Sequence, residues 1–434
     1  IQRHNGEAGC HRYILSNCSG AYHIAILHAM AKASGWESSL TVDLVPLFES
    51  IQDLDGARAE MQKLYTHPVY AAHLDLRGGD QTVMLGFSDG TKDGGYLRAN
   101  WAIYRAKQRL TDVSREHGRT VMFFDGRGGP PARGGGNTHR FYASLGRDIE
   151  NREIQTTIQG QTISSNFGIP KSAGFNLELL FTAGVKNRLF DEEETRILPE
   201  DEALLDELGT TSYDHYLALR NRPEFTDYLA TFGTLKYYGE TNIGSRPTSR
   251  AKDGAINFED LRAIPFVGSW SQLKQNVPGY FGLGTALEAL DREGRLEEAA
   301  SLYRRNAFFR TLVENSMQSM TKCDFRLTAH LAAHPQFGDL WNTVHEEYER
   351  TRVLVLAITG QQKLMETVPS IRESIRLRDS IIMPLLVIQQ FALTEMERQT
   401  SSTEPADSDW TPELLRKLII RTMYGIVNAS RNAV

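Results

Sequence analysis

The chain has 434 residues, with 48 Lys and Arg against 54 Asp and Glu, which gives a formal net charge of −6. Its apolar fraction of 41% and charged fraction of 24% exclude a wholly disordered, collagen-like or disulfide-scaffold protein. The small negative charge argues against a nucleic-acid-binding protein, because no basic excess can neutralise phosphates. No apolar run approaches the ~18 residues of a membrane span, and three cysteines without a CxxC spacing indicate a reduced, cytoplasmic setting.

Length alone is compatible with two or three domains, or with one large α/β barrel that carries insertions. Over the first 270 residues, short apolar runs alternate with amphipathic stretches, which is typical of βα units around a buried parallel sheet. The amphipathic stretches predict helices at residues 22–34, 55–65 and 97–115. The apolar runs predict strands at residues 13–15, 41–48, 83–87, 120–124, 154–158 and 264–267.

The strand pattern fades from about residue 282. Helical patterns then occur at residues 288–305, 340–358, 370–399 and 412–430. We therefore expect residues 1–281 to form the βα units and residues 282–434 to form a helical region that packs on them. Earlier in the chain, the acidic stretch at residues 191–207 predicts a solvated helix or loop.

Two histidines, His330 and His334, have the i, i+4 spacing that can hold zinc. No HExxH pattern or third ligand accompanies them, so a structural role is favoured.

Two acidic residues follow predicted strands, at the end where α/β sheets and barrels place their sites. Glu49 ends the run at 41–48, and Asp89 follows the run at 83–87, with Lys92 about one helical turn further. Carboxylates in such positions can hold Mg²⁺ or Mn²⁺, which prefer oxygen ligands. The alternatives are a capped helix start at Asp89 and a surface or capping carboxylate at Glu49.

Four arginines lie beside further predicted strands or proline-fixed segments. Arg127 and Arg133 belong to a glycine-rich segment at residues 126–136, where backbone N–H groups can approach an anion closely. Arg246 and Arg262 occur further along the chain. Guanidinium groups bind phosphate and carboxylate through paired hydrogen bonds. With the two carboxylates they suit a divalent metal and a small, multiply anionic substrate; the alternatives are a flexible surface loop and rim salt bridges.

These segments, in this order, resemble the phosphoenolpyruvate carboxylase family. The resemblance runs from about residue 13 to the end and rests on seven ordered motifs and two C-terminal ones. The motifs are VPLFESIQDLDGA (45–57), MLGFSDGTKDGGYLRANW (84–101), GRGG–RGGG (126–136), TIQGQ (157–161), NIGSRP (242–247), LRAIPFVGSW (261–270), PGYFGLGTAL (278–287), RLRD (376–379) and RNAV (431–434).

The resemblance implies an α/β fold of the (β/α)₈ TIM-barrel type, with the later strands present, the first strands missing, and an extensive α-helical region following. It implies a homotetrameric carbon–carbon lyase. In this family, bicarbonate and phosphoenolpyruvate give oxaloacetate and phosphate through carboxyphosphate and an enolate, with Mg²⁺ or Mn²⁺ as cofactor.

The resemblance also implies roles for individual residues. Glu49 and Asp89 match the metal ligands, and Lys92 matches a lysine beside the metal aspartate, for which we expect an electrostatic role. The arginines divide into two groups. Arg133 matches the loop residue that closes over the intermediate and excludes water, and the residues that match substrate and carboxyphosphate binders are Arg127, Arg246 and Arg262.

The family is inhibited by aspartate or malate, and the resemblance implies an effector site in this chain. Lys322, Arg378, Asn432 and Arg133 occupy the matching positions. A dicarboxylate bound there would hold Arg133 away from the active site, which is differential binding to an inactive state.

The chain departs from the family pattern at several positions. Asp125 stands where the family usually has His before the glycine loop, and Gln161 replaces the usual Glu. The family's SDSxKDxG is SDGTKDGG here, and its terminal NTG is Asn432-Ala433-Val434. We interpret these changes as a divergent branch, in which Asp125 weakens phosphate binding or gives Arg127 a different partner.

Family members are roughly twice as long, and their N-terminal half carries a TAHPTE histidine and a further substrate-binding arginine that this chain lacks. We therefore expect a C-terminal piece that binds Mn²⁺ and a dicarboxylate but carboxylates poorly without its N-terminal half. Two alternatives stay open. One is a non-catalytic regulatory or assembly module of the family, and the other is a phosphoenolpyruvate-utilising phosphotransferase barrel, which would need a phosphorylatable His domain.

Overall fold

A computed structural model describes residues 1–36, 40–158, 161–190, 192–241, 243, 257–401 and 409–430. Five strands form one parallel sheet in which each strand lies beside the next one in the chain. They are β1 (Arg12–Leu15), β2 (Asp43–Phe48), β3 (Asp80–Gly86), β4 (Thr120–Gly126) and β5 (Ile154–Thr156). The strands predicted before residue 160 are confirmed, with shifts of a few residues at their ends.

The sheet is parallel because helices carry the chain back between successive strands. β3 and β4 pair over their full lengths, from Asp80 opposite Thr120 to Gly86 opposite Gly126, so their carboxyl ends finish at the same level. The connecting elements are α2 (Ala21–Ala33), α3 (Ile51–Thr66), α4 (Pro68–Leu76), α5 (Phe87–Glu116), η1 (Pro131–Arg133) and α6 (Thr138–Ala143), and a short α1 (Gln2–Asn5) precedes the sheet.

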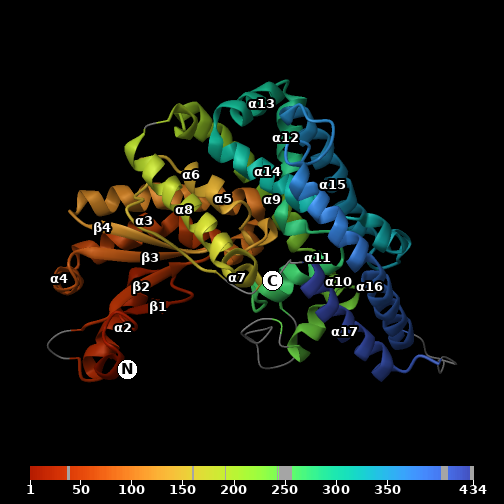
Figure 1. Ribbon diagram of the computed structural model, residues 1–434, viewed down its shortest axis with the longest axis horizontal. Coiled ribbons are helices and arrows are strands. Elements are labelled where there is room, and N and C mark those ends of the chain that lie inside the picture. Colours follow the sequence, from red (N-terminus) through yellow and green to blue (C-terminus); the bar gives the residue numbers. More distant parts are fainter. Residues whose placement is uncertain are drawn as a thin grey trace.

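Helices dominate the rest of the chain, and no strand follows β5 among the described residues. Figure 1 shows the strands on one side and the later helices on the other. These helices are α7 (Gln161–Phe167), α8 (Pro170–Leu189), α9 (Pro199–Arg220), α10 (Phe225–Thr231), α11 (Ala263–Gln272), α12 (Leu283–Arg292), α13 (Leu296–Arg305), α14 (Ala307–Thr321), α15 (Gly338–Thr359), α16 (Pro369–Ser401) and α17 (Pro412–Ser430). Short 3₁₀ segments lie between them: η2 (Glu193–Thr195), η3 (Leu235–Glu240), η4 (Val277–Gly279) and η5 (Phe325–Ala333).

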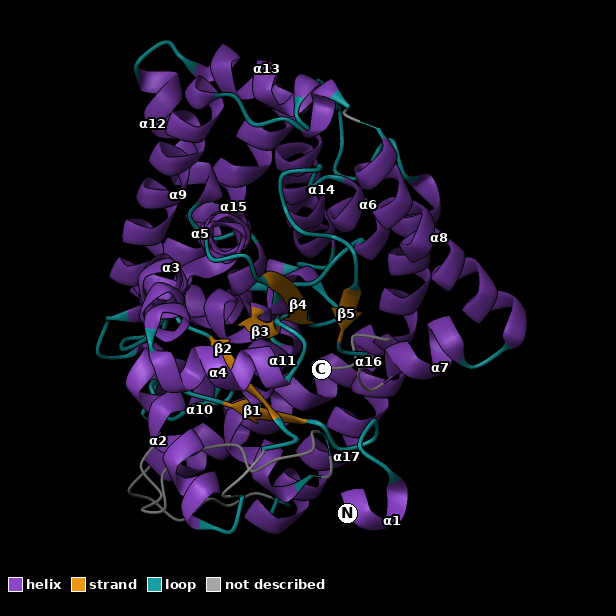
Figure 2. Cartoon of the chain, turned by 90° about the vertical axis from the view of Figure 1, so that its left-hand side faces the viewer, coloured by secondary structure: helices purple, strands orange, loops and turns teal. Residues whose placement is uncertain are grey.

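One hydrophobic core joins the sheet to the helical region. Val83 of β3, Trp101 of α5, Leu287 of α12 and Phe308 of α14 belong to the same buried cluster, and α5 lies against the sheet with later helices around it (Figure 2). The prediction that the helical region packs on the βα units is confirmed. A second core surrounds Trp270 of α11.

The strand predicted at residues 264–267 is wrong, because this segment lies in α11. Arg262 is the N-cap, and Pro265 lies in the first helical turn, where its missing N–H costs no hydrogen bond. Phe266 and Trp270 are both fully buried at helical spacing. A helix buried on most sides has a continuous apolar sequence, which over four residues cannot be distinguished from a buried strand.

Two helix predictions also need correction. The pattern at 288–305 is two helices, α12 and α13, separated by Gly294 with a φ of 73°. The stretch predicted at 191–207 is helical from Pro199, but Leu204 and Leu205 are buried there rather than solvated. None of the described helices combines the length and apolarity that a bilayer crossing requires.

Candidate functional site

The two predicted metal ligands lie at the ends of neighbouring strands. Glu49 follows β2, and Asp89 lies in the first turn of α5, directly after β3. The β2–β3 register pairs Phe48 with Leu85, which sets Glu49 beside Gly86. A Cβ on Gly86 would lie 3.0 Å from Cγ of Glu49, so glycine allows the close packing of these strand ends. Both carboxylates are half-buried.

These residues suit a hard divalent cation held partly by the protein. The backbone N–H of Asn17 donates to Oε2 of Glu49 at 2.9 Å, which orients that carboxylate. Among the described residues, no group of three or more His, Cys, Asp or Glu could hold a metal ion. Mg²⁺ is commonly bound by one or two carboxylates, with waters and substrate oxygens completing its shell. The pair Glu49 and Asp89 therefore fits such an ion, whereas a closed zinc-like site does not fit.

Arg127 is buried at the carboxyl end of β4. Its Nη1 donates to Oγ1 of Thr138 at 3.0 Å, and its Nη2 donates to the carbonyl of Gly135 at 2.9 Å. The guanidinium lies over the Phe141 ring, 4.6 Å from its centroid. Burial lowers the pKa of Arg127, so a charged guanidinium here would gain from an anionic partner.

Arg133 belongs to the same glycine-rich segment, which contacts the start of α5 next to Asp89. Oγ of Ser88 donates to the Arg133 carbonyl at 3.1 Å, which ties the segment to the residue before Asp89. Burial lowers the pKa of Arg133 to about 10, and the negative charge of Asp89 opposes that shift. The Ser88 contact thus joins the backbone of Arg133 to the start of α5, next to Asp89.

The glycine-rich segment is packed too closely for larger residues. A Cβ on Gly135 would lie 2.1 Å from the Gly128 carbonyl oxygen, and one on Gly136 would meet the Asn315 side chain at 2.4 Å. Oδ1 of Asn315 accepts the Asn137 N–H at 3.1 Å, and its Nδ2 donates to the hydroxyl of Tyr96 at 2.8 Å. Sequence analysis missed Asn315, because a polar residue in a distant helix carries no local motif.

The side chain of Lys92 contacts the segment just before Arg262. Its Nζ donates to the carbonyls of Phe258 and Leu261, at 3.0 and 2.9 Å, and lies 4.5 Å from the Phe258 ring centroid. Arg262 is the half-buried N-cap of α11. Arg246 lies outside the described residues.

A cavity of about 690 Å³ opens beside the glycine-rich segment. Arg127, Gly129 and Thr138 line one side of it, and residues of α7 and α8 line the other. Lys322 also reaches this cavity. This cavity borders the predicted substrate-binding arginine and has the size expected for a small-molecule site.

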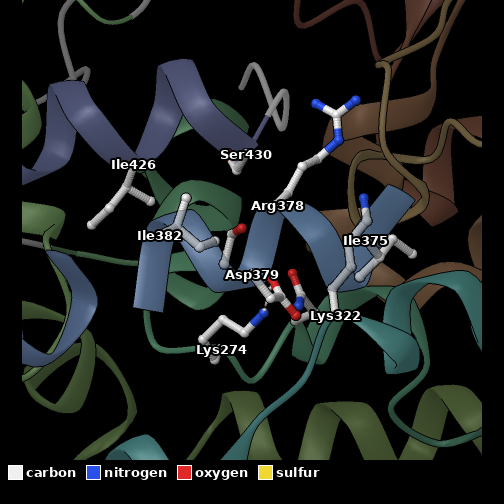
Figure 3. Close-up of a pocket in the computed structure, with 10 residues that line it drawn as sticks. Lys274, Lys322, Ile375, Arg378, Asp379, Ile382, Ile426 and Ser430 are labelled. Carbon is white, nitrogen blue, oxygen red and sulfur yellow. Dashed lines mark hydrogen bonds and ion pairs between the residues drawn. The ribbon is translucent and has the colours of Figure 1, made fainter. Parts of the chain in front are cut away.

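The predicted effector residues surround two small adjoining pockets. Lys322 lines both of them, Arg133 lines one and Arg378 lines the other. In Figure 3, Lys274 points to Asp379, whereas Lys322 and Arg378 extend toward the opposite side of the pocket. The Lys274 ammonium donates to Oδ1 of Asp379 at 2.8 Å.

The pKa of Lys322 is lowered in this pocket. Burial and, secondly, the positive charge of Lys274 lower its pKa to about 8. An added anion would therefore stabilise its charged form. The fourth predicted effector residue, Asn432, lies outside the described residues.

His330 and His334 pack against an aromatic side chain. Their rings lie 6.4 and 5.3 Å from the ring centroid of Phe232. Nδ1 of His334 accepts the Gln336 N–H at 3.2 Å, a contact that is typical of a structural residue.

A parallel sheet with two carboxylates and buried arginines at its strand ends is the arrangement of an α/β enzyme that acts on anionic substrates. Comparison of the sequence with known proteins identifies the family. The phosphoenolpyruvate carboxylase family model matches residues 1–433, and the chain belongs to this family. The resemblance seen in the motifs is therefore confirmed.

Individual relatives agree with that assignment. The phosphoenolpyruvate carboxylase of Corynebacterium diphtheriae is 37% identical over 403 residues, which cover 90% of this chain and 43% of the relative. That of Mycobacterium avium is 35% identical over 449 residues, which cover 99% of this chain and 47% of the relative. The chain spans about half the length of the curated relatives it matches.

Proposed function

We propose that this chain carries the metal-binding and phosphate-binding part of a phosphoenolpyruvate carboxylase. The observation that supports this most directly is the hydrogen bond that joins Ser88, next to Asp89, to the Arg133 carbonyl at the strand ends, with Glu49 packed beside Gly86 on the neighbouring strand. A cation held by the carboxylates and a guanidinium beside it would bind a phosphate from two sides. Family membership gives the substrates, phosphoenolpyruvate and bicarbonate.

The proposed reaction forms carboxyphosphate first. A bicarbonate oxygen attacks the phosphorus, and the bond between phosphorus and the enol oxygen breaks, which leaves the pyruvate enolate. Carboxyphosphate then gives CO₂ and phosphate, and the enolate carbon bonds to CO₂ to give oxaloacetate. Mg²⁺ or Mn²⁺ held by Glu49 and Asp89 would supply positive charge for the phosphate and the developing enolate oxygen.

The arginines of this chain would stabilise negative charge and exclude water. Arg127 and Arg262, together with Arg246, would bind the phosphate and carboxylate groups. Arg133 would close over carboxyphosphate, which water would otherwise hydrolyse. Lys92 would fix the segment before Arg262 through its two carbonyl contacts.

Effector binding would use the same loop arginine. Lys322 lines the pocket shared with Arg133 and the pocket shared with Arg378, which supports an aspartate or malate site that also involves Asn432. A dicarboxylate bound between these cations would compete for Arg133 and favour an inactive state.

The larger architecture of the parent enzyme follows from the same family. The row β1–β5 would be an arc of a (β/α)₈ barrel formed within residues 1–281, with residues 282–434 as its helical region. The remaining strands would come from an N-terminal half, and four such chains would assemble as a homotetramer.

Metal binding by an Asp89→Asn variant tests the proposed function. We expect Mn²⁺ affinity, measured by calorimetry, to fall at least ~10-fold, because one of two anionic oxygen ligands becomes a neutral amide. Asp55→Asn is the matched control, since Asp55 forms an exposed pair with Arg98. Equal Mn²⁺ affinity in both variants and the parent chain would favour the non-catalytic module instead.

A further inference from the structure

A buried ion pair lies behind the substrate-binding arginine. Asp125, near the end of β4, is 1% exposed, and Lys107 of α5 is 2% exposed. Nζ of Lys107 donates to Oδ2 of Asp125 at 2.8 Å, and the hydroxyl of Tyr142 donates to the same oxygen at 2.7 Å. The ammonium also lies 4.7 Å from the Phe123 ring centroid. Asp125 is the residue that replaces the histidine usual in this family.

The positions of Asp125 and Arg127 favour an ion pair between them. They are two residues apart at the end of one strand, where alternate residues share a face, and both are buried. Burial lowers the pKa of Arg127, and the negative charge of Asp125 opposes that shift. Even so, Arg127 forms no ion pair with a carboxylate among the described residues.

The hydrogen bonds of Asp125 go to Lys107 and Tyr142 rather than to Arg127. Lys107 and Tyr142 both occupy Oδ2, while Oδ1 of Asp125 has no hydrogen-bond partner among the described residues. Asp125 lines a small cavity together with Asn187. The guanidinium of Arg127 donates instead to Gly135 and Thr138.

We propose that Lys107 is a positioning residue that binds Asp125 and so keeps its carboxylate from pairing with Arg127. The three charges sum to +1, and that charge remains available to an anion at Arg127. The role of Arg127 as a phosphate binder rests on the proposed function, but the arrangement of the three charges does not. Tyr142 assists by bonding the same carboxylate oxygen.

The proposal predicts that one substitution weakens phosphate binding and that a second substitution restores it. Lys107→Met leaves the buried Asp125 charge without its partner, so Asp125 turns to Arg127 and blocks it. Adding Asp125→Asn removes the competing charge and frees Arg127 again. A lysine that served only the packing of α5 would show no such rescue.

Titration with inorganic phosphate, followed by calorimetry, tests the consequence for anion binding. Lys107→Met is expected to bind phosphate at least ~10-fold more weakly than the parent chain, and Lys107→Met/Asp125→Asn is expected to recover to within ~3-fold. Arg115→Met on the same helix is the control, because the exposed Arg115 forms a 3.6 Å ion pair with Glu150 and donates to the Asp148 carbonyl, away from Asp125. If Lys107→Met binds phosphate more weakly and the double variant does not recover phosphate affinity, the proposal is overturned.

A second measurement needs no ligand. Double-mutant cycles on chemical unfolding give the coupling between Asp125→Asn and Arg127→Met, first with Lys107 present and then in the Lys107→Met background. When Lys107 is removed, the coupling free energy between the two substitutions is expected to increase by at least about 1.4 kcal/mol, which corresponds to a ~10-fold change in an equilibrium constant. Unchanged coupling overturns the proposal.

Tyr142→Phe keeps the measurement possible if Lys107→Met does not fold. It removes only one hydrogen bond to Asp125, and the same cycle in that background is expected to show a ~2-fold to 5-fold rise in coupling. If the parent chain itself binds no phosphate, the proposed role of Arg127 fails, while the unfolding cycles still decide the role of Lys107.

Discussion

Individual buried charges determine what the strand-end site can bind. Arg127, Arg133 and Lys322 all have pKa values lowered by burial, so each would be stabilised by an anion placed against it. The motif residues that carry these charges could be identified from the sequence. Their supporting partners Lys107 and Asn315 could not, because they lie on helices whose local pattern is only helical.

The pKa of Lys322 gives a pH dependence for dicarboxylate binding. Its lowered pKa of about 8 means that the ammonium is charged below pH 8 and loses its charge as the pH rises through 8. Because a dicarboxylate at the proposed effector site would pair with the charged form, we expect aspartate affinity to be highest below pH 8 and to fall at least ~5-fold by pH 9.5. Calorimetric titrations across this range check the prediction, and Lys322→Arg, which stays charged, is expected to remove the pH dependence.

Arg133 is expected to serve both the active site and the effector site. Arg133→Ala should weaken aspartate binding by ~10-fold or more, because a charged hydrogen-bond partner is lost from a buried pocket. The same variant in a full-length carboxylase should lose activity. Arg326→Ala is the control, since Arg326 is exposed and pairs with the neighbouring Asp324. Unchanged aspartate binding by Arg133→Ala would refute the shared role.

At the scale of elements, short apolar runs predicted the strands well but misassigned α11. The runs at 41–48 and 120–124 are strands because their side chains are buried between helices. The run at 264–267 is equally apolar, yet it lies in the buried helix α11, where the Phe266 ring contacts Phe225 of α10. Tertiary packing of distant segments decided between these two outcomes, and a four-residue window contains no information about it.

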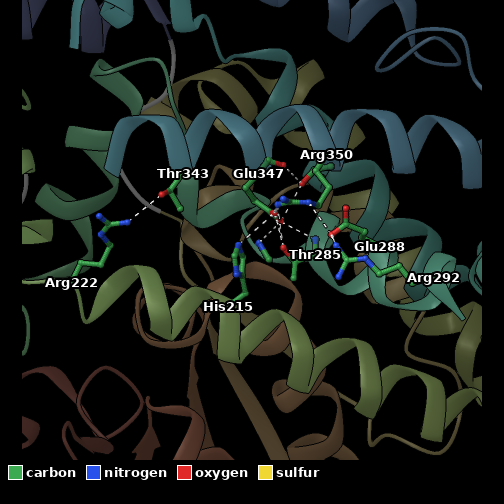
Figure 4. A network of polar contacts seen from close by, with 10 residues as sticks. His215, Arg222, Thr285, Glu288, Arg292, Thr343, Glu347 and Arg350 are labelled. Atoms are coloured by element: carbon green, nitrogen blue, oxygen red, sulfur yellow. Dashed lines mark hydrogen bonds and ion pairs between the residues drawn. The ribbon is translucent and has the colours of Figure 1, made fainter. Parts of the chain in front are cut away.

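The start of α12 depends on a carboxylate from another helix. Glu347 of α15 is 0% exposed, and its Oε1 accepts the N–H groups of Gly282 and Thr285, both at 3.0 Å. Figure 4 shows His215 and Arg350 around the same carboxylate. Glu347 thereby satisfies N–H groups that a helix start leaves without intrahelical partners and adds charge where the helix dipole favours it.

Removing this carboxylate is expected to destabilise the packing of α12 against α15. Glu347→Ala should lower the free energy of unfolding by ~3–5 kcal/mol, because it leaves the N–H groups of Gly282 and Thr285 without their acceptor and removes one of the two carboxylates that pair with Arg350. Urea denaturation followed by circular dichroism checks this value. Glu349→Ala on the same helix breaks a half-exposed pair with Arg352 and should cost at most ~1 kcal/mol. Similar losses in the two variants would contradict the capping role.

At the scale of the whole molecule, one core unites the sheet with the helical region, and the site lies where they meet. Leu85 of β3 and Met320 of α14 belong to that core, and Lys322 follows α14 directly. A change in the position of α14 would therefore move both Asn315, which holds the glycine-rich segment, and Lys322. This connection gives effector binding a physical route to Arg133.

The chain by itself is expected to bind metal without completing the reaction. It spans 43% of the Corynebacterium diphtheriae relative, and the family's TAHPTE histidine is absent from its sequence. In a malate-dehydrogenase-coupled assay with phosphoenolpyruvate, bicarbonate and Mn²⁺, we expect no bicarbonate-dependent formation of oxaloacetate above background. A full-length relative in the same assay is the positive control, and calorimetric Mn²⁺ binding shows that the chain is folded. Sustained oxaloacetate formation by the 434-residue chain would refute this prediction, because these residues would then suffice for every step.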